Sequence, residues 1–153
     1  MGLSLEFYLG DSEAITRAVA DIEPSRLDDP AIVSRSADLS LHIDPADLDL
    51  LSESIGRVTA QNPRRLRPEL EPVVGEQDYG ALLVAQDWVE YVAVLQHDQV
   101  NEVAGHWARA MRDKHDDPGI VATEDVRNAI DRLVDLCHCA LTSGGKVVHV
   151  WYG

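Results

Sequence analysis

Three short stretches of the chain have the apolar pattern of a strand. Residues 3–9 (LSLEFYL) and 39–43 (LSLHI) alternate apolar and polar positions, and residues 146–152 (KVVHVWY) form an aliphatic and aromatic run. A period of two is typical of a strand that buries one face, and a short apolar run after a turn is typical of a buried strand. We therefore predict three strands at these positions.

Four longer stretches carry apolar residues at intervals of three and four, the spacing of a helix with one buried face. Asp44 followed by Pro45 predicts a helix start, because aspartate caps free N–H groups and proline fits the first helical position. Thr123 is a second N-cap, and Gly144 and Gly145 supply the positive φ that ends the last helix. The predicted helices cover residues 12–23, 45–58, 99–112 and 124–142.

Two stretches between these elements are less regular. Residues 61–80 combine three prolines, two glycines and an arginine cluster, which favours a long surface loop. Residues 81–95 fit both a helix face and a strand. We favour a strand over residues 89–95, which gives the element order β-α-β-α-loop-β-α-α-β.

This order predicts an α+β fold: a small mixed sheet of about four strands packed with four helices. A chain of 153 residues with 45% hydrophobic content is long enough for one core, so we expect residues 1–153 to form a single domain. The chain has no stretch of about 18 uncharged apolar residues that would span a membrane. Its start lacks the basic segment of a secretory signal, and its two cysteines are too few for a disulfide framework. We expect a cytoplasmic protein.

Acidic residues outnumber basic ones by 27 to 13, and the net charge is −14. The basic exception is the segment 56–67, which contains Arg57, Arg64, Arg65 and Arg67 and no acid. An acidic surface repels nucleic acid and anionic membranes and speeds association with cationic partners. We therefore expect no nucleic-acid or membrane partner. A chain poor in lysine and rich in aspartate also arises from GC-rich coding or a salty habitat, without any partner.

The cysteines and histidines near the end of the chain do not have the spacing of a metal site. Cys137 lies on the apolar stripe of its helix and Cys139 points about 200° away from it, so the two sulfurs do not converge on one ion. His149, between two valines of the last strand, is expected to be a hydrogen-bonded core histidine. His115 and Asp116 lie at a helix exit, where polar residues are common. We expect no metal and no cofactor.

No stretch of the chain has the pattern of a known catalytic site. A Gly-rich phosphate loop and a nucleophile elbow are both missing from the sequence. We lean towards a protein that is not an enzyme.

Carboxylates cluster around the second predicted helix at Asp44, Asp47, Asp49 and Glu53. They lack the alternating spacing and central glycine of a calcium loop. Exposed acidic runs are most often simply solvated. The same four residues are also candidates for contact with a basic protein, since acidic side chains steer docking.

The segments LVDLCHCALTSGGKVVHVWYG, MGLSLEFYL and EYVAVLQHDQVNEVAGHW are together similar in pattern to the YfbM-like family of small uncharacterised bacterial proteins. That family ends in a helix, a Gly-Lys-type turn and an aliphatic strand that bears an aromatic residue. The resemblance covers about half of the chain, and residues 36–80 depart from it. It implies an α+β fold and no known activity, so no functional residue is carried over.

Two hypotheses for function follow. The first is a non-catalytic protein-binding module, such as an immunity or inhibitor protein against a basic partner. The alternative is a small anion-binding protein or enzyme in which Arg64, Arg65 and Arg67 grip the ligand through bidentate hydrogen bonds. If these arginines bind no ligand, we expect them to form ion pairs within the chain, with Glu69, Glu71 or the acidic helices. The sequence does not indicate the oligomeric state.

Overall fold

The computed structural model describes residues 4–41, 43–69, 74–75 and 78–153. Within these residues one five-stranded sheet is formed, with the strand order β2-β1-β5-β4-β3. The strands are β1 (Ser4–Gly10), β2 (Val33–Asp38), β3 (Val74–Gly75), β4 (Tyr79–Leu83) and β5 (Lys146–Tyr152). The helices are α1 (Ser12–Ala20), η1 (Pro24–Asp28), α2 (Pro45–Thr59), α3 (Gln86–Ala93), η2 (His97–Gln99), α4 (Val100–His115) and α5 (Glu124–Ser143).

The predicted α+β class is confirmed, with one difference in the sheet. Every strand pairing among the described residues is antiparallel, so the sheet is not mixed. The reason is the position of β5, which returns from α5 and runs between β1 and β4, antiparallel to both. Its register with β1 places Leu5 opposite Trp151 and Phe7 opposite His149.

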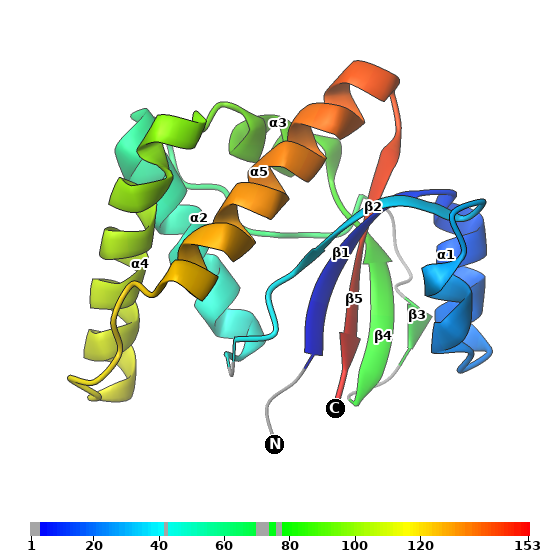
Figure 1. The fold of residues 1–153 in the computed structure, drawn as a ribbon, viewed down its shortest axis with the longest axis horizontal. Coiled ribbons are helices and arrows are strands. Elements are labelled where there is room, and N and C mark those ends of the chain that lie inside the picture. Colours follow the sequence, from blue (N-terminus) through cyan, green and yellow to red (C-terminus); the bar gives the residue numbers. More distant parts are fainter. Residues whose placement is uncertain (1–3, 42, 70–73, 76–77) are drawn as a thin grey trace.

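The helices cover the two faces of the sheet unequally. Helices α2 to α5 lie together on one face, and α1 lies on the other (Figure 1). The larger core joins Leu5, Phe7 and Leu9 of β1 to the apolar stripes of the four helices. The smaller core joins Tyr8, Val148 and Val150 to Ile15, Ala18, Val19, Leu27 and Ala81. Among the described residues, no helix is long and apolar enough to cross a membrane.

Helix α2 begins as its sequence predicts and packs against α4. The Asp44 side chain accepts a hydrogen bond from the N–H of Asp47, and the Asp47 side chain accepts one from the N–H of Asp44, which completes a capping box. The indole N–H of Trp107, on α4, donates to the backbone oxygen of Asp47 at 2.9 Å. This bond brings the start of α2 close to α4.

The strand expected at residues 39–43 is wrong. The strand is β2, which ends at Asp38, and residues 39–41 lead from it towards α2. β2 is an edge strand whose middle residues, Ser34, Arg35 and Ser36, are exposed, so backbone pairing rather than apolar alternation defines it. The apolar residues that follow, Leu39 and Ile43, are buried without forming a strand.

The strand expected at residues 89–95 is also wrong, because residues 86–93 form helix α3. Trp88 and Tyr91 fill the core beneath α2, where the Trp88 indole N–H donates to Ser52 Oγ at 3.1 Å and the Tyr91 hydroxyl donates to the Ser52 carbonyl. The strand of this region is β4, which begins at Tyr79 inside the predicted loop 61–80. Parts of that loop, residues 70–73 and 76–77, and also Leu3 and His42 of the predicted strands, lie outside the described residues.

Candidate functional site

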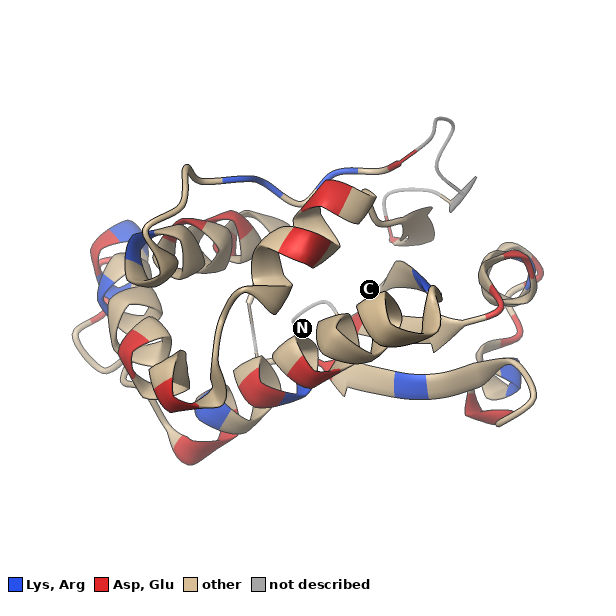
Figure 2. Cartoon of the chain, turned by 90° about the horizontal axis from the view of Figure 1, so that it is seen from above, with Lys and Arg blue, Asp and Glu red and all other residues tan. Residues whose placement is uncertain are grey.

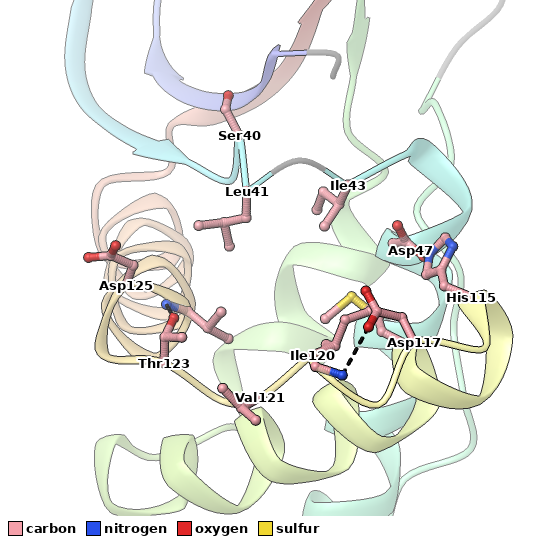
Figure 3. A pocket seen from close by; sticks show the side chains of 13 residues that line it. Ser40, Leu41, Ile43, Asp47, His115, Asp117, Ile120, Val121, Thr123 and Asp125 are labelled. Carbon is pink, nitrogen blue, oxygen red and sulfur yellow. Dashed lines mark hydrogen bonds and ion pairs between the residues drawn. The ribbon is translucent and has the colours of Figure 1, made fainter. Parts of the chain in front are cut away.

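A cleft of about 690 Å³ separates the β2–α2 linker from the α4–α5 loop. Leu41 and Ile43 project into it from the linker, and Ile120 and Val121 from the loop (Figure 3). The backbone oxygen of Ile120 accepts a hydrogen bond from Arg112 at 2.7 Å, which ties the loop to α4. The cleft therefore has an apolar lining held between two connecting segments.

Asp47 lies at one end of this cleft and is almost completely buried, with 1% of its surface exposed. Lys114 Nζ lies 2.9 Å from Asp47 Oδ1, and His115 Nε2 lies 2.9 Å from the same oxygen. The other oxygen accepts the capping-box bond from the Asp44 N–H at 3.0 Å. Both oxygens of a buried carboxylate are thus satisfied, as burial of a charge requires.

These bonds determine the charge of Asp47. Burial alone raises the pKa of the carboxyl, but the hydrogen bonds from Asp44, Lys114 and His115 outweigh it and hold the pKa below its ordinary value. Asp47 is therefore a carboxylate at neutral pH, and because Oδ1 accepts, the Nε2 of His115 carries a proton.

Asp44, Asp47 and His115 also satisfy the distance requirement of a metal site, since their ligand atoms lie within 4.8 Å of one another. The ammonium of Lys114, however, contacts Asp44 at 3.0 Å and Asp47 at 2.9 Å. Lys114 supplies the positive charge that two close carboxylates need, so a metal ion would have to displace it. This arrangement favours a structural ion cluster over a metal centre.

Two further carboxylates line the cleft. Asp117 accepts a hydrogen bond from the N–H of Gly119 at 2.9 Å, and Asp125 lies in the first turn of α5, at the end opposite Asp47 (Figure 3). Neither forms an ion pair with any residue that the structure describes. The cleft is therefore mainly apolar, and at Asp117 and Asp125 it carries negative charge that no ion pair among the described residues compensates.

The segment that carries the three arginines predicted to bind an anion runs as extended chain beside α3 (Figure 2). Arg64 lies 3.0 Å from Asp87 Oδ2, and Arg67 contacts the same oxygen. The hydrogen bond from Arg67 is the main cause that lowers the pKa of Asp87, and Arg64 adds to it. Arg65 is exposed and has no ion-pair partner in the described part of the chain. The arginines thus pair with an acidic helix, but at Asp87 rather than Glu69, whose carboxylate accepts from the N–H of Gln86.

The structure does not bring together the four acids predicted to contact a partner. Asp44 and Asp47 belong to the ion cluster with Lys114, Asp49 lines a different crevice, and Glu53 is exposed farther along α2. The expectation that Asp47 lies on a solvated face is wrong, because the capping box turns its side chain inward.

The approach of Lys114 and His115 to Asp47 is not visible in the sequence. Lys114 and His115 follow Asp47 by 67 and 68 residues in the sequence, and the packing of α2 on α4 brings them together. A partial signal existed, since a capping box beside an apolar stripe places one of its carboxylates near the core.

The predicted burial of Cys137 on the apolar stripe of its helix and of His149 in the core is confirmed. Cys137 is buried and Cys139 is partly exposed, and both are free thiols. His149 is buried and its Nδ1 lies 3.0 Å from the backbone oxygen of Glu6.

Comparison of the chain with protein-family models, curated proteins and solved structures gives no significant match. The resemblance to the YfbM-like family therefore stays a prediction.

Proposed function

We propose that this chain is a non-catalytic protein-binding module whose cleft accepts a basic segment of a partner, in the manner of an immunity or inhibitor protein. The observation that carries the proposal is the lining of the cleft, where apolar side chains are flanked by Asp117 and Asp125, two carboxylates that form no ion pair within the described ranges. A lysine or arginine side chain has an apolar stem, which can pack against the apolar lining of the cleft, and a charged head, which can pair with its carboxylates.

The charge of the whole chain supports this choice of partner. A net charge of −14 attracts cationic surfaces from a distance and disfavours nucleic acid, whose phosphates are repelled. We place the protein in the cytoplasm, because its two cysteines are free and a reducing compartment keeps them so.

Titration with defined peptides tests the proposal. A nine-residue peptide that alternates lysine and leucine is expected to shift the NMR resonances of Leu41, Val121 and Asp125, and to bind more weakly as salt is added.

Two double variants test the role of the cleft carboxylates. Asp117→Asn/Asp125→Asn should bind this peptide several-fold more weakly than the wild type does. The matched variant Glu90→Gln/Asp98→Asn makes the same change of charge away from the cleft and should bind almost as the wild type does. Equal binding of a glutamate–leucine peptide, or a shift map away from the cleft, would contradict the proposal.

The arginine segment supports a second proposal, an anion site. Arg64 and Arg67 share one carboxylate oxygen of Asp87, so the group keeps an excess positive charge, and Arg65 adds to it. Phosphate, nucleotides and carboxylates are expected to raise the melting temperature of the wild type but not that of the Arg64/Arg65/Arg67→Ala variant. If no anion stabilises the wild type, this second proposal fails and the first is unaffected.

A further inference from the structure

A second, smaller crevice of about 410 Å³ lies between the start of α2 and strands β4 and β5. Its walls are mostly apolar and include Ala46, Leu48, Leu66 and Leu82. Its volume lies within the range of about 300–1,000 Å³ that is typical of small-molecule sites. It shares none of its lining with the cleft described above.

His149 and Trp151 of β5 give this crevice an aromatic wall. Their ring centroids are 5.7 Å apart with an interplanar angle of 35°, and behind them the Phe7 ring stacks on His149 at 4.6 Å. A flat aromatic molecule can stack or pack edge-on against such a wall, which adds to the effect of apolar burial.

The hydrogen bond of His149 fixes which of its ring nitrogens carries the proton. The backbone oxygen of Glu6 can only accept, so the Nδ1 that lies 3.0 Å from it is an N–H. Burial lowers the pKa of His149 to about 4, against the smaller opposing effect of that hydrogen bond, so the ring is neutral. A neutral ring with a proton on Nδ1 has a bare lone pair on Nε2.

That lone pair has no donor in the part of the chain that the structure describes. His149 is 4% exposed, and it lines the crevice. Since Nδ1 is turned to the backbone of β1, Nε2 is the nitrogen that remains for the crevice. Nε2 is not among the buried side-chain atoms that lack a partner in the described residues, so it remains in contact with solvent in the crevice, and a ligand that donates to it takes the place of water.

We propose that this crevice is a binding site for a small, uncharged aromatic molecule with one N–H or O–H group, which donates to His149 Nε2 while the ring packs against Trp151, Leu48 and Leu82. An anionic ligand is disfavoured, because the carboxylate of Asp49 also lines the crevice. The site is independent of the proposed protein-binding cleft.

Indole and 1-methylindole form a matched pair of probes, since methylation removes the N–H donor and keeps the ring. Indole is expected to bind with a millimolar Kd, shifting the resonances of Leu82 and Trp151, and 1-methylindole roughly tenfold more weakly. In protein labelled with ¹⁵N at histidine, Nε2 of His149 should have the shift of an unprotonated nitrogen in the free protein and should move on addition of indole. Equal binding of the two probes, no binding of indole up to its solubility, or a protonated Nε2 in the free protein would overturn the proposal.

Two variants locate the binding. Ala46 is exposed in the first turn of α2, so Ala46→Phe is expected to fill the crevice and abolish indole binding without unfolding the protein. Ala20→Phe makes the same change at the exposed end of α1, on the other side of the sheet, and should leave binding unchanged. If Ala46→Phe binds indole as the wild type does, the assignment to this crevice is wrong.

Discussion

The two faces of the sheet are protected to different depths. Four helices bury one face around Trp88, Trp107 and Phe7, whereas α1 and η1 alone cover the other. On the side covered by four helices, here called the thick side, Asp47 has partners for both carboxylate oxygens, whereas Asp87 Oδ1 is buried with no partner among the described residues. On the thin side, which α1 and η1 cover, the half-buried Glu6 accepts hydrogen bonds from Ser4 and Tyr8. The Tyr152 hydroxyl of this side is buried with no partner among the described residues. The two faces therefore differ in the depth of their apolar packing, and each side leaves one buried side-chain oxygen without a partner among the described residues.

The largest effect is expected from deleting strand β5, because it contributes side chains to both faces of the sheet. Strand β5 lies at the centre of the sheet and contributes Val147 and His149 to one face and Val148 and Val150 to the other. Deletion of residues 147–152 is expected to abolish cooperative unfolding, measured by circular dichroism on heating. A soluble deletion variant with a sharp transition would show that neither core needs the strand.

Truncation of one core side chain on each face measures the difference directly. Trp107→Ala is expected to cost about 3–5 kcal/mol of unfolding free energy, because it leaves a large cavity and an unpaired Asp47 carbonyl. Ile15→Ala, under the single helix α1, should cost about 2–3 kcal/mol, since a thin layer can collapse around the smaller cavity. Urea titration checks both, with Trp107→Phe as the control that keeps a ring. An equal or larger loss for Ile15→Ala would contradict the comparison.

Asp47→Asn tests the ion cluster of the thick side. The asparagine NH₂ group cannot accept the hydrogen bond that one carboxylate oxygen of Asp47 accepts. We therefore expect the free energy of unfolding to fall by about 1–3 kcal/mol at pH 7. Because the pKa of Asp47 is lowered on folding, its contribution is present above the unfolded pKa of about 4 and is lost as the pH falls through the folded value. The cost of the substitution should therefore shrink in acid. Asp49→Asn, which breaks none of these bonds, should change stability little.

His149 gives the thick side a second dependence on pH, at higher pH than Asp47. Its pKa is about 4 in the folded protein, whereas an unfolded chain takes up the proton at about pH 6.5. The unfolded state then binds more protons between these values, so stability falls by roughly 1.5 kcal/mol from pH 6.5 to pH 5. Chemical denaturation at several pH values measures this slope. His149→Phe should flatten it, and an unchanged slope would assign it to other groups.

The smallest effect is expected from Glu6, on the thin side, and it has the opposite direction to that of Asp47. Burial raises the pKa of Glu6 above its ordinary value, and the hydrogen bond from Ser4 opposes this only in part. The ionised form is therefore disfavoured by folding, so stability falls as the pH rises through the folded pKa. Glu6→Gln is expected to be neutral or to stabilise the protein by less than about 1 kcal/mol at pH 7. A clear loss would show that the ionised carboxylate is needed.

The parts of the fold that local chemistry determines could be predicted from the sequence. The N-caps at Asp44 and Thr123 and the left-handed Gly144 that ends α5 each act within one turn of chain. The two wrong strands had tertiary causes. β2 is held by backbone pairing at a polar edge, and α3 is a helix because Trp88 and Tyr91 bond to Ser52 of α2.

The candidate sites could not be predicted from sequence patterns either, because tertiary packing brings their residues together. The apolar lining of the cleft comes from two connecting segments, which carry no periodic signal of their own. The arginines could be recognised as a basic group, but their partner Asp87 belongs to helix α3, in a region whose pattern fits both a helix and a strand and where a strand over residues 89–95 was favoured. His149 was correctly expected in the core, but its proton position depends on Glu6, 143 residues away in the sequence.

The pairing of β1 with β5 has a consequence for how the chain acquires its fold during synthesis. β1 needs β5 on one edge, and the contacting residues are separated by almost the whole chain, so an emerging polypeptide holds β1 half-paired until residues 146–152 have left the ribosome. Contacts of such long sequence separation slow folding, and an unpaired strand edge invites aggregation in the interval. A circular permutation that joins β5 directly to β1 would turn this long-range pairing into a local hairpin, and we expect it to speed folding.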